Sequence, residues 1–242
     1  MRAAIFLNGS PDSAGLLRRV ARSADFVVAA DGGARYALEA GVVPDLVVGD
    51  MDSLGEDLVR ELERCGASLE RHPVRKDKMD GQLAVLAARE RGAITADLLC
   101  AVGGRLGALF AVPQILLAAE RIGLRSTVVD DRGRMFVIEA GSRTVEGVPE
   151  DSISIFPLSG PAAGVTLEGM EYPLENASLE PGDTLGFHNE LIGREATVSV
   201  GDGALLVVHE TENPVTGYTD SSTETPYDNR RLCRRLFDPR LF

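Results

Sequence analysis

The 242-residue sequence has no tryptophan, and aromatic residues make up only 5% of it. Its three cysteines form no Cys-x-x-Cys pair and its three histidines are scattered, so neither set has the spacing of zinc ligands. No apolar stretch approaches the roughly 20 residues of a membrane-spanning helix, and the one at the N-terminus is too short for a signal peptide. These absences predict a cytoplasmic protein that does not insert into a membrane.

Basic residues are also in the minority, with 25 lysines and arginines against 37 aspartates and glutamates and a formal net charge of -12. Nucleic acids and anionic membranes bind to basic surfaces, so neither is expected as a partner. A phosphate-bearing ligand remains compatible with this charge, because a metal ion can bridge carboxylates to phosphate oxygens.

Residues 1–130 alternate short apolar runs with segments of helical periodicity. The runs FVVAA at 26–30 and LVVG at 46–49 are continuous and lead into polar turns. Strands of this kind, alternating with helices, are typical of a parallel sheet that is covered on both faces. The pattern predicts an α/β domain built on a doubly wound, Rossmann-like parallel sheet.

Residues 131–212 are short β-rich segments, such as ISIFPLSG at 153–160, separated by glycine, proline and asparagine turns. They show no helical period, which indicates an antiparallel sandwich or barrel, and we expect an all-β sandwich domain. Residues 213–242 are polar and interrupted by proline, and we interpret them as a solvated tail with a basic end.

Polar clusters follow several of the expected strands. In an open parallel sheet, ligands bind beyond the carboxyl ends of the strands, so this shared position indicates a binding site. Asp31, Gly32 and Gly33 follow one strand, where paired glycines let a phosphate or a sugar approach the backbone. The alternative is a tight turn with an aspartate cap.

Two carboxylates, Asp50 and Asp52, close the next strand. They point to opposite faces of a regular strand, but they can converge where the backbone turns at its end. Convergent carboxylates bind a hard cation such as Mg²⁺, which takes substrate phosphates as further ligands. The alternative is that Asp52 caps the following helix, which leaves Asp50 unexplained.

The two remaining clusters are Lys76-Asp77 with Asp80, and Gly103-Gly104-Arg105. Asp77 and Asp80 have a spacing similar to a capping box, whereas the functional interpretation makes Lys76 a phosphate contact and the carboxylates metal or substrate ligands. Arg105 can hold phosphate oxygens bidentately, and its alternative is a glycine turn with an exposed arginine.

These clusters, followed by a β-rich half, resemble the thiamine pyrophosphokinase family from about residue 6 to residue 208. The most specific pieces are ADGGA at 30–34, PDLVVGDMDS at 44–53, KDxxD at 76–80 and GGR at 103–105. The segments GVTLEGMEYPLENASL at 164–179 and LGFHNELIGREATVSV at 185–200 are also similar to the family's pattern.

The resemblance implies that the pyrophosphoryl group of ATP passes to the hydroxyl of thiamine, with release of AMP, in a homodimer whose subunits share the thiamine site. It implies magnesium as cofactor, with the metal and catalytic residues Asp50, Asp52, Asp77 and Asp80. It implies nucleotide or phosphate contacts at Asp31, Gly32, Gly33, Lys76, Gly104 and Arg105, and substrate contacts at Gln82, His188 and Asn189.

The sequence departs from the family's pattern near this site. Met79 and Gln82 stand where the family has threonine and glutamate, and Gly107, Ala108 and Val112 replace aspartate, histidine and asparagine. Two other hypotheses therefore stand beside a working thiamine pyrophosphokinase. One is a catalytically weak relative that binds thiamine or nucleotide as a sensor or carrier. The other is a pyrophosphokinase for a different alcohol, with room for a larger acceptor at positions 107 and 108.

Overall fold

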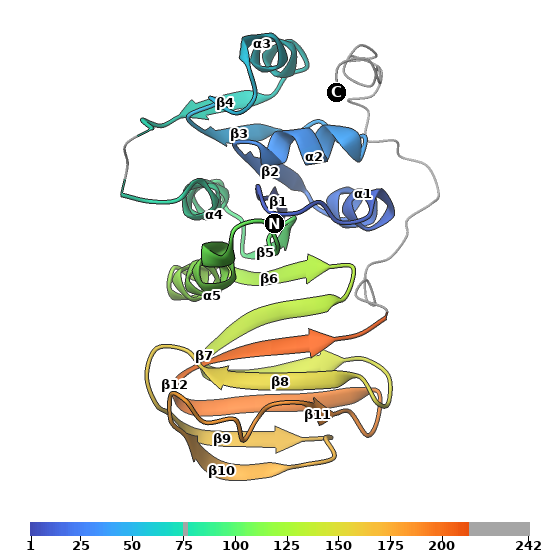
Figure 1. Ribbon diagram of the computed structural model, residues 1–242, viewed down its shortest axis with the longest axis vertical. Coiled ribbons are helices and arrows are strands. Elements are labelled where there is room, and N and C mark those ends of the chain that lie inside the picture. The colour runs from blue at the N-terminus through green and yellow to red at the C-terminus, as the bar shows by residue number, and fades with distance from the viewer. Residues whose placement is uncertain (75–76, 213–242) are drawn as a thin grey trace.

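Parallel strands form the N-terminal half of the computed structural model, which describes residues 1–74 and 77–212 (Figure 1). Their order across the sheet is β6-β5-β1-β2-β3-β4. The strands are β1 (Arg2–Phe6), β2 (Phe26–Ala30), β3 (Leu46–Gly49), β4 (Ser68–Arg71), β5 (Thr95–Leu99) and β6 (Arg125–Asp130). The chain moves outward from β1 to β4 and then returns to the other side of β1, so the order reverses between β1 and β5.

Helices cover both faces of this parallel sheet. Those on one face are α1 (Ala14–Arg22), α2 (Gly33–Glu39) and α3 (Glu56–Arg64), and those on the other are α4 (Asp80–Glu90) and α5 (Leu106–Arg121). Adjacent residues of one strand serve different cores, since Phe6 packs with α1, α2 and α3 whereas Ile5 packs with α4 and α5. The predicted doubly wound α/β arrangement is confirmed, and burial on both faces explains why its strands are apolar throughout.

The C-terminal half is antiparallel. Its strands are β7 (Gly133–Glu146), β8 (Ser152–Pro157), β9 (Ala162–Glu168), β10 (Leu174–Leu179), β11 (Asn189–Glu190) and β12 (Glu195–Glu210). The long strands β7 and β12 pair along their length, with a register shift between Val200 and Ala204. Before the shift β12 pairs with β9, and after it β12 pairs with β8. A separate apolar core forms between these layers, which confirms the predicted β-rich half.

The two halves share one hydrogen-bonded sheet of 12 strands, which the sequence did not indicate. β6 pairs with β7 in antiparallel fashion, with Thr127 opposite Phe136 and Asp130 opposite Gly133. The expected boundary at residue 130 therefore falls in the tight turn between two paired strands. The predicted tail at 213–242 lies outside the described residues. Within residues 1–74 and 77–212, no helix is long and apolar enough to span a bilayer.

Candidate active site

A cleft of about 660 Å³ opens at the carboxyl ends of the central strands. Its walls come from the segment after β1, from Asp31 after β2, from the start of α4 and from residues 101–112 after β5. This is the edge of the sheet where the strand order reverses, the position at which open α/β sheets bind ligands.

Three carboxylates gather beside this cleft. Asp31, Asp50 and Asp52 each offer an oxygen atom that lies within 4.8 Å of the others. Asp31 is buried, and its Oδ1 has no hydrogen-bond partner within the described part of the chain, whereas Asp50 is half-buried and Asp52 is exposed. A buried carboxylate oxygen without a donor is costly unless a cation satisfies it. The three residues therefore fit a hard, oxygen-seeking metal ion such as Mg²⁺.

Backbone geometry at the strand ends brings the three side chains together. Asp31 and Met51 both have positive φ angles, of 44° and 65°, so the chain turns sharply after β2 and again after β3. The backbone N–H of Asp52 donates a 3.2 Å hydrogen bond to Oδ1 of Asp50, which folds the second carboxylate back toward the first. The turn thus converts an i, i+2 pair that would point apart into a convergent one.

Mutual repulsion within the cluster raises the pKa of Asp52. Its hydrogen bond and its electrostatic repulsion with Asp50 raise the pKa of the Asp52 carboxyl, and Asp31 adds a smaller repulsion in the same direction. A divalent cation among the three would remove this repulsion, so the electrostatics agree with the unsatisfied oxygen of Asp31.

Asp80, the first residue of α4, lies close to Asp31 at the position of Gly49. The capping alternatives for Asp52 and for the Asp77–Asp80 pair do not apply. The cap position of α4 is Met79, which excludes a capping box that begins at Asp77, and the cap position of α3 is Gly55, which excludes Asp52 as its cap. Asp77 is exposed and does not belong to the carboxylate group, whose third member is Asp31 instead.

The predicted nucleotide contacts divide into two groups. A Cβ atom on Gly32 would stand 2.6 Å from the side chain of Asn8, and one on Gly33 would overlap the carbonyl oxygen of Phe6. Close packing of the loop after β2 against β1 therefore explains both glycines. Gly104 and exposed Arg105 line the cleft, where the guanidinium has access to a ligand. Lys76 lies outside the described residues.

None of the three predicted substrate contacts lines this cleft. Gln82 is half-buried in the first turn of α4. Asn189 is buried in β11, where its side-chain amide accepts from the backbone N–H of Tyr172 at 3.0 Å and donates to the carbonyl of the same residue at 2.7 Å. The structure thus uses this amide to hold the loop at Tyr172. His188 is exposed, and its Nδ1 lies 3.0 Å from Oγ of Ser152.

One carboxylate at the same sheet edge was missed by the sequence. Burial raises the pKa of Asp12 to about 6, although its carboxylate accepts a 2.9 Å hydrogen bond from the backbone N–H of Cys100. Asp130 and Asp131 add repulsion. The position of Asp12, shortly after β1, was the available signal, because it too follows the carboxyl end of a strand.

The departures from the family pattern all reach the cleft except Gln82. Gly107 and Ala108 line it in the first turn of α5, and a Cβ atom on Gly107 would meet nothing within 4 Å. Val112 is buried in the wall below them, and Met79 is exposed at the start of α4. This side of the cleft is therefore apolar and open, whereas the side formed by Asp31 and Asp80 is acidic.

Comparison with known proteins assigns the chain to a class. The family model described as "Thiamin pyrophosphokinase, catalytic domain" matches residues 17–126, and the one described as "Thiamin pyrophosphokinase, vitamin B1 binding domain" matches residues 143–205. The first covers most of the parallel half with its cleft, and the second covers most of the antiparallel half. Fold and site together define a pyrophosphokinase, a transferase.

Relatives agree over nearly the full chain. Thiamine pyrophosphokinase of Bacillus subtilis (strain 168) is 28% identical over 186 residues, covering 76% of this chain and 87% of that protein. The crystal structure of the enzyme from Bacillus subtilis has a TM-score of 0.75 at 26% identity, covering 88% of this chain and all of that one. The crystal structure of the Geobacillus thermodenitrificans enzyme has a TM-score of 0.72 at 30% identity, covering 93% and 100%. The chain belongs to the thiamine pyrophosphokinase family.

Proposed function

We propose that this chain transfers the pyrophosphoryl group of ATP to the hydroxyl of thiamine, forming thiamine diphosphate and AMP. The observation that supports this most directly is the carboxylate group of Asp31, Asp50 and Asp52 beside a cleft at the sheet edge where the strand order reverses. Transfer of this kind depends on positioning and charge neutralisation more than on covalent help from the protein.

The roles of the residues follow from where they lie. Asp31, Asp50 and Asp52 hold Mg²⁺, and Asp80 extends the acidic wall toward the cleft. The bound ion supplies neutralisation of the negative charge on the polyphosphate. Arg105, exposed at the rim, contacts phosphate oxygens, and the role predicted for Lys76 is retained as part of the proposal. Asp77 lies outside the carboxylate group, so we assign it a secondary role in binding the ligand.

We further propose a homodimer in which each site combines two subunits. Within one chain, seven strand-to-strand steps separate β11, next to His188, from β2, which precedes Asp31. At about 4.8 Å per step this is on the order of 30 Å, which is too far for one thiamine molecule to bridge. A second copy can supply its β half to the cleft.

The exposed apolar side chains agree with such a dimer. Leu106 and Phe110 project from the start of α5 beside the cleft, with 80% and 79% of their surfaces exposed. Tyr172, Leu185 and Phe187 are 62% to 67% exposed near β11. Large apolar groups that gather on a surface mark sites of association.

The expected domain boundaries, at 130 and 212, and the cytoplasmic location stay predictions.

The decisive experiment is to incubate the full chain with ATP, Mg²⁺ and thiamine and to follow AMP and thiamine diphosphate by chromatography. Both products should form in equal amounts. Asp50→Asn should abolish both, whereas Asp57→Asn, an exposed change in α3, should leave both unchanged. AMP without thiamine diphosphate would contradict the proposed acceptor.

A second candidate is a binding protein with weak or no turnover. It is favoured by the apolar wall at Gly107 and Ala108, where the cleft lacks the aspartate and histidine of the family's pattern. Calorimetry separates the two functions. Binding of thiamine and ATP without product in the chromatographic assay would support the binding protein and contradict the enzyme.

A further inference from the structure

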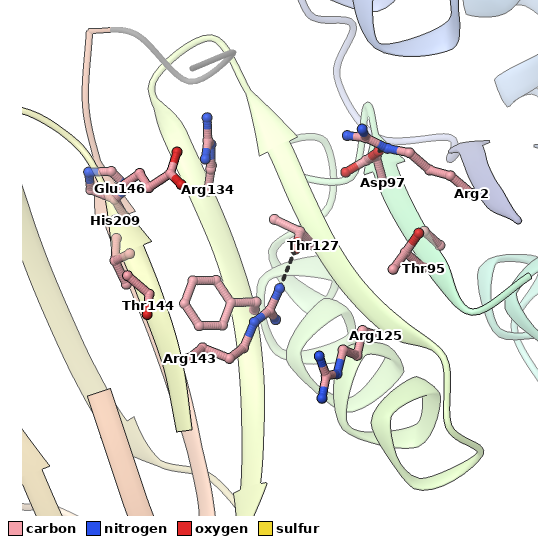
Figure 2. Close-up of a pocket in the computed structure, with 13 residues that line it drawn as sticks. Arg2, Thr95, Asp97, Arg125, Thr127, Arg134, Arg143, Thr144, Glu146 and His209 are labelled. Atoms are coloured by element: carbon pink, nitrogen blue, oxygen red, sulfur yellow. Dashed lines mark hydrogen bonds and ion pairs between the residues drawn. The ribbon is translucent and has the colours of Figure 1, made fainter. Parts of the chain in front are cut away.

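A second cavity, of about 370 Å³, lies at the opposite edge of the parallel sheet (Figure 2). Arg2, Thr95 and Arg125 line it, and they are the first residues of β1, β5 and β6. The catalytic cleft lies at the other ends of these strands. Because each strand has five or six residues at about 3.3 Å per residue, about 15 Å or more separates the two places.

The sheet leaves a polar face uncovered at this edge. Thr95 pairs with Arg125, and Asp97 pairs with Thr127, so alternation places all four side chains on one face. Leu99 is the only residue of β5, and Val129 the only residue of β6, in the core under α1, α2 and α3. Both lie near the carboxyl ends of their strands. The far end of β7, at residues 143–146, forms the opposite wall of the cavity (Figure 2).

Positive charge dominates the lining. Four arginines, Arg2, Arg125, Arg134 and Arg143, face two carboxylates, Asp97 and Glu146. Nε of Arg2 lies 2.6 Å from Asp97, and Glu146 lines the same cavity as Arg134. His209 also lines the cavity, but burial lowers its pKa, so the imidazole adds no charge at neutral pH.

Four arginines against two carboxylates leave an excess of positive charge, and Arg125 and Arg143 form no ion pair with residues 1–74 or 77–212. Glu120, on α5, offsets part of this excess through its electrostatic attraction to both arginines. This concentration of basic side chains is notable in a chain whose net charge is -12.

Arg143 is held in place by two contacts, but not all of its hydrogen-bond donors have an acceptor among the described residues. Its guanidinium lies over the ring of Phe136, 4.1 Å from the centroid, and its Nη2 donates to Oγ1 of Thr127 at 3.3 Å (Figure 2). Its Nη1 is buried and has no hydrogen-bond partner among the described residues. A guanidinium keeps its charge in proteins, and a buried cationic donor without an acceptor is costly. The rest of this half-buried side chain lines the cavity, where an acceptor from outside the chain can approach its positive charge.

We propose that this cavity binds a small dianion of the phosphate class, either inorganic phosphate or a phosphate monoester, through Arg125 and Arg143. The planar guanidinium fork matches phosphate oxygens, and the threonine hydroxyls that line the cavity can add neutral hydrogen bonds. The volume is at the lower end of the range of small-molecule sites, which suits a small ligand. This inference does not depend on the proposed pyrophosphokinase reaction.

Isothermal titration calorimetry on the full chain tests the site, with inorganic phosphate in one series and glycerol 3-phosphate in another. EDTA is included so that no metal bridges either probe to the catalytic carboxylates. Binding of either probe is expected, with Arg125→Gln and Arg143→Gln each weakening it by about tenfold, as loss of a charge-assisted hydrogen bond predicts. Arg105→Gln, at the catalytic cleft, should leave the affinity unchanged.

The two series distinguish the source of the dianion. If only glycerol 3-phosphate binds, the ligand is a phosphate ester, and if both probes bind, the phosphate group itself is recognised. Arg125 is exposed, so Arg125→Gln keeps the test valid if Arg143→Gln fails to fold. The proposal is overturned if neither probe binds, or if Arg125→Gln leaves binding intact. Loss of binding in Arg105→Gln would assign the dianion to the catalytic cleft and would also overturn it.

Discussion

Oδ1 of Asp80 lies 3.2 Å from the point where a Cβ atom on Gly49 would stand, and the Cβ of Asp31 lies 3.0 Å from the same point. The missing side chain at position 49 therefore lets carboxylates from two different segments approach the end of β3. Gly49 also has a φ of 151°, a conformation that side chains rarely adopt. One glycine thus sets the spacing of the acidic wall.

Gly49→Ala should displace Asp31 or Asp80 and reduce kcat by more than tenfold. Strained backbone and close contacts should also lower the free energy of unfolding by about 1–3 kcal/mol. Steady-state kinetics and urea denaturation measure the two effects. Gly55→Ala is the matched control, because Gly55 also has a positive φ, of 77°, but its Cβ would meet nothing within 4 Å. Equal loss of activity in both variants would refute the spacing role of Gly49.

Asp12→Asn should stabilise the protein at neutral pH. Folding raises the pKa of Asp12 from 3.8 to about 6, so the folded state binds more protons between these values and stability falls as pH rises through them. Because the side chain is partly exposed, we expect a gain of only about 1 kcal/mol at pH 7 and a flatter profile from pH 4 to 6. Urea denaturation across this pH range measures the free energy of unfolding, with exposed Glu63→Gln as the control. A profile as steep as that of the unmodified chain would contradict the assignment.

Asn189→Ala should lower the free energy of unfolding by about 1–3 kcal/mol, because the buried amide holds both backbone groups of Tyr172. The Michaelis constant for thiamine should rise as the loop loosens. His188→Ala, at the neighbouring exposed position, should change stability by less than about 0.5 kcal/mol. If Asn189→Ala unfolds like the unmodified chain, the amide does not position the loop.

Mixed dimers should reveal a shared site. Asp50→Asn and Asn189→Ala chains with different tags are co-expressed, and the heterodimer is purified through both tags. In a twofold dimer, one site then combines an intact cleft with an intact β half, so activity should be about half that of the unmodified dimer. Both homodimers serve as controls, and thiamine is held far below the raised Michaelis constant of Asn189→Ala, so that each homodimer should be nearly inactive. A site built within one chain predicts an inactive heterodimer.

Gly107→Asp combined with Ala108→His should raise turnover, by roughly tenfold, since an aligned acid or base in the cleft wall typically contributes at least this much. The open space around Gly107 accommodates the aspartate without strain. Gly107→Ala is the control for the loss of glycine, and single-turnover kinetics separates chemistry from binding. Unchanged turnover would mean that other residues have taken over these roles.

Several structural features followed from the sequence because they depend on local pattern. The run at 26–30 predicted a strand buried on both faces, and the structure buries four of its five residues. Asp31, Asp50 and Asp80 were placed at the correct edge of the sheet because each follows a strand or opens a helix.

Other features depend on how distant segments meet. The sequence grouped Asp50 and Asp52 with Asp77 and Asp80, whereas the structure groups them with Asp31. The pairing of β2 with β3 and the positive φ angles after both strands determine which carboxylates converge. Hydrophobic periodicity encodes neither feature. Close packing of Gly32 and Gly33 against β1 was likewise not evident from the sequence, and their nucleotide role stays a prediction.

By itself, the sequence determined the type and order of the elements, the doubly wound half followed by a β-rich half, and the family. Burial imposes those patterns residue by residue, so they can be read along the chain. Only the tertiary structure decided that β6 pairs with β7, that Asp31 completes the carboxylate group, and that arginines from several strands line one cavity. Such contacts join residues that are far apart in the chain, and strand register and turn geometry alone bring them together.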